Sequence, residues 1–136
     1  MGRLTHLLDS SVHARLANPV VARKFLDLQG EGNVARCGIL HLEALFSAGD
    51  PRQIHEQLIR ALPLVPTHQA DFDRAAEVML LLADRGRHRA VGAADLVLAA
   101  VAERARLTVL HYDRDFERIA EVTGQPVEAV VSLGSL

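Results

Sequence analysis

Short apolar runs alternate along this chain with longer segments in which apolar residues recur at helical spacing. The short runs cover residues 4–8, 34–37, 62–65, 107–110 and 127–131, and each has the length of a buried β-strand. The longer segments predict helices after Ser10 or Ser11, after Asn18-Pro19, and over residues 39–48, 50–61, 67–83, 92–105 and 113–122, with Thr67 as the cap of the fifth. Such alternation is typical of a parallel sheet covered by helices. We therefore predict an α/β fold, a three-layer α/β/α sandwich around a central parallel sheet of about five strands.

Length and composition indicate one globular domain over residues 1–136. Hydrophobic residues make up 49% of the chain and charged residues 24%, a balance that excludes a disordered protein. The single cysteine, Cys37, excludes an internal disulfide framework and a cysteine-based zinc cluster, and we expect it to be buried rather than nucleophilic. No apolar stretch approaches the roughly 20 residues that span a bilayer, and Asp9 interrupts any signal-peptide core. We expect a soluble, cytoplasmic protein without a membrane contact.

The charge balance argues against a surface that attracts nucleic acid as a whole. Fifteen basic residues, of which only Lys24 is lysine, face seventeen acidic ones, and the net charge is −2. With four phenylalanines, one tyrosine and no tryptophan, a surface built on base stacking is not expected either.

Two acidic residues follow predicted strands. Asp9 comes directly after the first strand, and Asp113 follows the strand over residues 107–110 after two intervening residues. Because the carboxyl ends of parallel strands meet at one edge of a sheet, where ligands bind in such folds, we expect the two carboxylates to lie close together. Each position alone also suits a helix cap.

Two further acidic residues lie in segments that are otherwise apolar. Glu43 belongs to the helix over residues 39–48, which has almost no polar face, and Asp95 opens a run of apolar residues. Burying a lone carboxylate costs several kcal/mol, so each needs either an arginine partner or a cation. Four carboxylates in one cleft would be held together by divalent cations, and Mg²⁺ and Mn²⁺ prefer oxygen ligands.

Four fragments carry a resemblance to a known family. They are Leu-Leu-Asp-Ser-Ser at residues 7–11, Leu-Glu-Ala-Leu at 42–45, the run from His88 to Ala102, and the segment from Thr108 to Ala120 that contains Asp113-Arg114-Asp115-Phe116. In this order and spacing, the chain resembles the PIN-domain ribonucleases, and most closely the VapC-type toxins of bacterial toxin–antitoxin pairs. The resemblance runs along nearly the whole chain.

The resemblance implies an activity, a site and partners. It implies a PIN-like fold and an endoribonuclease whose Mg²⁺ or Mn²⁺ is held by four catalytic carboxylates, Asp9, Glu43, Asp95 and Asp113. Asp115 is similar to a second acid that often lies near the metal, and Ser11 to a hydroxyl residue that hydrogen-bonds the site. The implied products carry 5′-phosphate and 3′-hydroxyl ends. The implied partners are the RNA substrate, a VapB-like antitoxin and a second copy of the toxin, joined in a toxin–antitoxin hetero-oligomer.

Two features leave alternatives open. Many relatives carry threonine or serine where this chain has His111, which either reaches a phosphate or covers the strand end. The basic segment with Arg85, Arg87 and Arg89 leads into Asp95, and it is either a clamp for the RNA backbone or a solvated loop.

Two other enzyme classes do not fit the residues of this chain. A receiver-like phosphoacceptor needs a lysine late in the chain, and a haloacid-dehalogenase-type phosphatase needs Asp-x-Asp where this chain has Asp9-Ser10-Ser11. A non-catalytic RNA- or protein-interaction module on the same fold stays open. The helices over residues 39–48 and 50–61 also carry an apolar excess, which favours a groove for a partner protein, namely Leu42, Leu45, Phe46, Ile54, Leu58 and Ile59. The negative charge of the acidic cleft favours binding of a basic side chain from the antitoxin.

Overall fold

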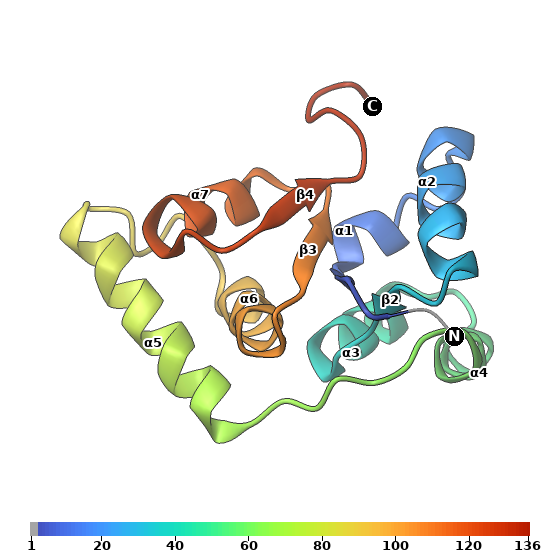
Figure 1. Cartoon of the computed structure of the whole chain (residues 1–136), viewed down its shortest axis with the longest axis horizontal. Coiled ribbons are helices and arrows are strands. Elements are labelled where there is room, and N and C mark those ends of the chain that lie inside the picture. Colours follow the sequence, from blue (N-terminus) through green and yellow to red (C-terminus); the bar gives the residue numbers. More distant parts are fainter. Residues whose placement is uncertain (1–2) are drawn as a thin grey trace.

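The computed structural model describes residues 3–136, and a four-stranded parallel sheet lies at its centre (Figure 1). The strands lie in the order β2-β1-β3-β4, with the bounds β1 His6–Leu8, β2 Val34–Ala35, β3 Thr108–His111 and β4 Val127–Ala129. All three neighbouring pairs are parallel. The predicted α/β fold with a central parallel sheet is therefore confirmed.

Helices flank this sheet (Figure 1). They are α1 Ser10–His13, α2 Pro19–Gly30, α3 Gly38–Ser47, α4 Pro51–Ala61, α5 Gln69–Asp84, α6 Ala93–Ala105 and α7 Arg114–Thr123. Pro19 and Pro51 open α2 and α4, where proline lacks only an N–H that has no partner in the helix. No helix in residues 3–136 is long and apolar enough to cross a membrane.

The register of the two central strands brings distant acidic residues together. Leu8 of β1 lies opposite Leu110 of β3, and the Asp9 N–H donates to the Leu110 carbonyl at 3.0 Å. Asp113 follows β3 by one residue, so both acids leave the sheet at the same carboxyl edge. This confirms the expected convergence of the strand ends.

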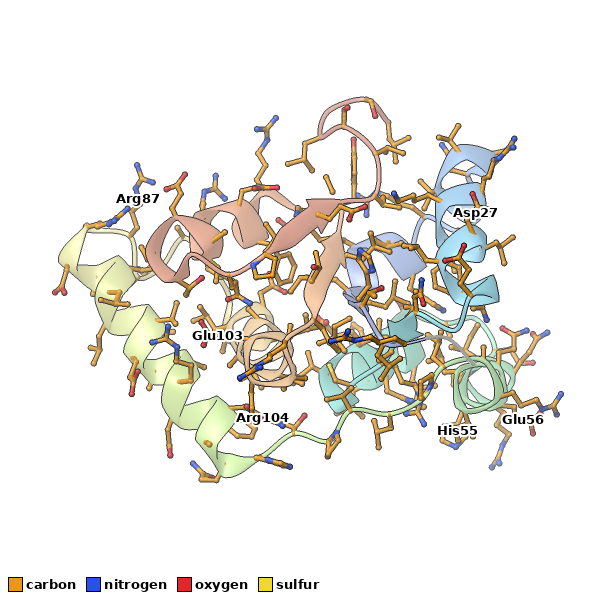
Figure 2. The ribbon with its side chains drawn as sticks, in the orientation of Figure 1. Asp27, His55, Glu56, Arg87, Glu103 and Arg104 are labelled. Atoms are coloured by element: carbon orange, nitrogen blue, oxygen red, sulfur yellow. The ribbon has the colours of Figure 1, made fainter. Side chains whose placement is uncertain are left out.

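Helix α6 forms the centre of the core on one side of the sheet. Seven consecutive residues, 96–102, are buried between β3, α5, α3 and α7. Arg104 of α6 donates to buried Asp71 of α5 at 2.8 Å, and Glu103 pairs with Arg74 at 2.8 Å (Figure 2). These ion pairs fix α5 along α6, and α6 in turn holds its first-turn Asp95 at the sheet edge.

Two details differ from the sequence-based expectation. The strand predicted over residues 62–65 is reduced to a single bridge between Leu64 and Arg36, because Pro63 and Pro66 have no N–H to extend a ladder. The sheet therefore has four strands where about five were predicted. The cap of α5 is His68 rather than Thr67, since the Asp71 carboxylate accepts from the His68 N–H at 2.8 Å.

Candidate active site

Four carboxylates from four separate elements line one cavity of about 730 Å³. Asp9 precedes α1, Glu43 lies on α3, Asp95 lies in the first turn of α6, and Asp113 precedes α7. The structure therefore brings together the four acidic residues that the sequence analysis singled out.

Asp9 caps a helix and also faces the cavity. Its Oδ2 accepts from the Ser11 N–H at 2.9 Å and from the Ser11 hydroxyl at 2.5 Å. Its Oδ1 is buried and has no hydrogen-bond partner among the described residues. A helix cap uses one oxygen only, so the unsatisfied oxygen remains available to a cation, and leaving it buried without one is costly.

Glu43 and Asp95 are not neutralised by arginine. Glu43 accepts a hydrogen bond from the Ser10 hydroxyl at 3.2 Å, which the sequence analysis did not anticipate. Within residues 3–136, neither Glu43 nor Asp95 forms an ion pair with a basic side chain. Of the two alternatives that the sequence left open for these carboxylates, an arginine partner or a cation, the described residues therefore provide no arginine partner.

Asp95, Asp113 and Asp115 form the tightest group of acids. One carboxylate oxygen from each lies within 4.8 Å of the other two. Since Mg²⁺ binds oxygen ligands at about 2.0–2.1 Å, oxygens on opposite sides of one ion are about 4.2 Å apart. The limit of 4.8 Å slightly exceeds this span, so the three side chains need only a small approach to hold a divalent cation, although Arg118 also donates to Asp115 at 2.6 Å.

The crowding of these acids changes how they titrate. Burial, followed by the charges of Asp9 and Asp113, raises the pKa of Asp95 from 3.8 to about 7. Burial also raises the pKa of Asp9 and of Glu43, and hydrogen bonds from Ser11 and Ser10 oppose the rise. The carboxylates thus repel one another, and a divalent cation between them would relieve this repulsion.

His111 is fully buried below the site. Its Nδ1 accepts from the Asp113 N–H at 3.1 Å, so the ring proton lies on Nε2, which is 3.2 Å from Glu117 Oε1. Burial lowers the pKa of His111, while Glu117 opposes the shift. Of the two alternatives, the structure favours a role in covering the strand end and orienting Asp113 over a contact with phosphate.

The basic segment between α5 and α6 lies outside the cavity. Arg85, Arg87 and Arg89 are exposed, none of them lines the acidic cavity, and Arg87 lies 3.6 Å from Glu121 of α7. Figure 2 shows Arg87 at the outer end of α5, beside α7. The geometry does not bring these arginines to the carboxylates, and their contact with an RNA backbone stays a prediction.

A second, smaller cavity adjoins the acidic one and contains two arginines that the sequence analysis missed. It shares Ser11 and Asp113 with the acidic cavity, and its other lining residues include Arg15, Tyr112 and Arg114. Arg15 lies four residues after Ser11 and Arg114 directly after Asp113, a spacing that could have drawn attention to both.

One wall of the acidic cavity is apolar. Leu42 and Phe46 of α3 line it, and their side chains are 68% and 93% exposed. Of the remaining apolar residues of α3 and α4 singled out from the sequence, Ile59 is exposed, Leu58 is buried, and Leu45 and Ile54 are partly buried. Cys37 is buried and caps α3, and burial raises the pKa of its thiol, as expected for a structural cysteine.

Known sequences similar to this chain belong to a family of the kind that the fold and the acidic cavity indicate. Residues 6–122 match the PIN domain family model. The chain is 44% identical over 133 residues to "Ribonuclease VapC21" of Mycobacterium tuberculosis, covering 96% of each chain. It is 38% identical over 135 residues to "Ribonuclease VapC51" of the same species, covering 98% of each.

Solved structures share the fold at low sequence identity. A DNA-bound VapBC from Salmonella typhimurium superposes with a TM-score of 0.75 at 19% identity, over 95% of this chain and 100% of that one. A VapBC2 from Rickettsia felis, bound to a DNA fragment from its promoter, gives 0.72 at 16% identity over 92% and 98%. At this level of identity the likeness concerns the fold.

Proposed function

This chain belongs to the PIN domain family, and from that premise we propose that it is a Mg²⁺- or Mn²⁺-dependent endoribonuclease toxin of the VapC type. The observation that carries the proposal is the cavity lined by Asp9, Glu43, Asp95 and Asp113, four carboxylates without a basic partner among the described residues. Relatives up to 44% identical over nearly the whole chain are named ribonucleases, which supports the substrate class.

The donor set determines the chemistry that we propose. Asp95, Asp113 and Asp115 would hold a divalent cation, with Asp9 Oδ1 and the Glu43 carboxylate completing the acidic shell. A cation bound there supplies a hydroxide at neutral pH and neutralises the charge that develops on the phosphate during in-line displacement. No serine or cysteine nucleophile is required.

The chain's own residues position the acids and regulate their charge. The hydroxyl of Ser11 holds Asp9 Oδ2, and the N–H of Asp115 holds Asp113 Oδ1 at 2.9 Å, so each aspartate keeps one oxygen fixed. The Ser10 hydroxyl orients Glu43 toward the cavity. This fixed arrangement lets the site accept a cation without rearranging its ligands.

Cleavage assays on purified variants test the proposal. We expect Asp9→Asn and Asp95→Asn to abolish cleavage of total RNA in Mg²⁺ or Mn²⁺ while the far-ultraviolet circular dichroism stays native, because each change removes a charged ligand but keeps the shape. Asp27→Asn is the matched control, since Asp27 is an exposed aspartate on α2, outside the acidic cavity (Figure 2). Full cleavage by Asp95→Asn in excess chelator would exclude the proposed mechanism.

The second candidate is a non-catalytic RNA- or protein-interaction module on the same fold. The PIN core packs in the same way whether or not the protein is an enzyme. In a non-catalytic module, the carboxylates of the cavity would bind a ligand without cleaving it. It predicts RNA or protein binding by the wild-type protein without any metal-dependent cuts in total RNA, and the assay above separates the two functions.

We further propose a VapB-like antitoxin as partner, assembled with a homodimer of this chain into a hetero-oligomer in the cytoplasm. VapBC complexes among the solved structures with this fold, from Salmonella typhimurium and Rickettsia felis, support the antitoxin. Exposed apolar side chains outside the site support further association, namely Val20 and Leu26 on α2 and Phe72, Leu80 and Leu81 on α5. Light scattering at high micromolar concentration tests the homodimer, and a monomeric mass would exclude it.

A further inference from the structure

The cavity beside the acidic site has the opposite charge character. Arg15, two residues after the end of α1, and Arg114, the first residue of α7, both line it, whereas no basic residue lines the acidic cavity. Within residues 3–136 neither arginine forms an ion pair, although Asp113 lines the same hollow. Two guanidinium groups without a carboxylate partner therefore lie within one hollow.

This hollow is built from three distant parts of the chain that hold one another in place. Arg15 donates to the Ser11 carbonyl at 2.7 Å, and its guanidinium carbon lies 4.9 Å from the centre of the Tyr112 ring. The Tyr112 hydroxyl accepts from the N–H groups of Gly134 and Leu136, each at 3.0 Å. The Tyr112 N–H donates to the Ser11 hydroxyl at 2.8 Å, so the hollow and the acidic site share a hydrogen-bonded wall.

We infer that this hollow, lined by Arg15, Tyr112 and Arg114, binds the phosphodiester group of the RNA that neighbours the one being cut. The inference rests on the proposed ribonuclease function and concerns how that substrate is held. Planar guanidinium groups match the geometry of phosphate oxygens, and stacking on a tyrosine ring restricts Arg15 to few conformations before RNA arrives.

Charge explains why such a subsite is needed. The acidic cavity repels a polyanion, and a cation between the carboxylates compensates only the phosphate that it contacts. The negative charge of Asp113 repels a neighbouring phosphate unless positive groups lie beside that phosphate. Arg15 and Arg114 provide such groups, because the hollow that they line adjoins the acidic cavity. The exposed arginines of the segment between α5 and α6 line neither cavity.

Steady-state kinetics on a short single-stranded RNA with a mapped cleavage site tests the inference. We expect Arg114→Gln to raise KM about tenfold near physiological salt with kcat unchanged, because it removes a charge-assisted contact in the bound state. The slope of log KM against log salt should fall by about 0.7, the value for one lost phosphate contact on a single strand. Arg114→Lys should retain part of the affinity, and Arg106→Gln is the matched control, because Arg106 is exposed and lines neither cavity.

A modified RNA substrate tests which phosphate the hollow binds. Replacing the linkage on either side of the cleaved bond by an uncharged methylphosphonate should raise KM of the wild-type enzyme at one side only. Arg114→Gln should be less sensitive than the wild-type enzyme to that same replacement, because one of the two charged contacts is already lost and only Arg15 remains. Equal sensitivity of wild type and variant, or an unchanged KM and salt slope in Arg114→Gln, would overturn the inference while the cleavage itself stands.

A binding measurement separates failure of the inference from failure of the proposed function. If the wild-type protein cuts no RNA, the proposed function fails, and the salt slope of RNA binding in fluorescence anisotropy then tests the hollow alone. A slope reduced in Arg114→Gln supports the inference, and an equal slope overturns it.

Discussion

Ser11 donates both its backbone N–H and its hydroxyl to the same oxygen of Asp9, Oδ2, at 2.9 and 2.5 Å. The hydroxyl oxygen also accepts from the Tyr112 N–H at the end of β3, at 2.8 Å. Ser11 thus connects the loops that follow the two central strands, and Asp9 Oδ1 stays buried without a partner among the described residues.

Removing the Ser11 hydroxyl should weaken the site without removing a ligand. We expect Ser11→Ala to lower Mn²⁺ affinity or RNA cleavage by roughly 10- to 100-fold, since groups that orient metal ligands typically contribute this much. Ser11→Thr retains the hydroxyl and should retain most of the activity. Isothermal titration with Mn²⁺ measures the first effect, and equal affinity in Ser11→Ala and wild type would contradict the assigned role.

The raised pKa of Asp95 should make the metal-free protein less stable as pH rises. Burial and the neighbouring carboxylates raise this pKa from 3.8 to about 7, so the folded state binds more protons than the unfolded state between these values. Stability should therefore fall between about pH 4 and pH 7 and level off above. We expect Asp95→Asn to be more stable than wild type at pH 8 by about 1–2 kcal/mol, or roughly 3–8 °C in Tm.

The same variant provides its own controls. At pH 4 the advantage of Asp95→Asn should largely disappear, because the wild-type carboxyl is then protonated in the folded state and to a large extent in the unfolded state as well. Added Mg²⁺ should stabilise the wild-type protein more than the variant. Thermal melts in chelator at the two pH values measure this, and a pH-independent difference would show that Asp95 does not titrate as described. Asp27→Asn should follow the wild-type curve.

Much of the site could be predicted because the signals are local. Asp9 and Asp113 directly follow strands of a parallel sheet, and Glu43 and Asp95 interrupt apolar helices, so short sequence windows contain the evidence for all four. Whether each acid is neutralised by arginine depends on packing between distant segments. Only the structure shows that the arginines pair elsewhere, for example Arg104 with Asp71.

What the sequence could not provide depends on long-range contacts. The hollow of Arg15, Tyr112 and Arg114 forms because the Tyr112 hydroxyl holds the C-terminal segment, which no periodicity indicates. The strand over residues 62–65 matched an apolar pattern, but ladder formation depends on N–H groups that Pro63 and Pro66 lack. Asp71 lies in the first turn of α5, and its buried ion pair depends on Arg104 of α6, which is distant in the sequence.

The ion pair between α5 and α6 should contribute strongly to stability. Asp71 is 1% exposed and accepts from Arg104 Nε at 2.8 Å and from the His68 N–H at 2.8 Å. Burial raises the pKa of Asp71, but these hydrogen bonds outweigh it and the net shift is downward. Arg104→Ala leaves a buried carboxylate without its partner, and we expect a loss of about 3 kcal/mol at pH 7 in chemical denaturation.

The pH dependence distinguishes this effect from lost packing. Because the pKa of Asp71 is lowered in the folded state, its contribution is present above the unfolded-state value near 4 and is lost as pH falls below it. The difference between wild type and Arg104→Ala should therefore shrink in acid. Arg106→Ala, an exposed arginine that forms no ion pair in residues 3–136, is the control and should cost little.

The apolar wall of the acidic cavity should determine how tightly the antitoxin binds. Phe46 is 93% exposed, so the isolated chain gains almost nothing from its ring, and Phe46→Ser should leave Tm unchanged. If an antitoxin segment covers this wall, burying the ring contributes about 2 kcal/mol, and the variant should bind roughly 30-fold more weakly. Titration with the purified VapB-like antitoxin measures the affinity. Leu64→Ser, at an exposed apolar residue outside the cavity, should bind like wild type. Equal affinity of Phe46→Ser and wild type would show that the antitoxin does not use this wall, and a loss of the dimeric mass in Phe46→Ser would assign the ring to contact between toxin copies instead.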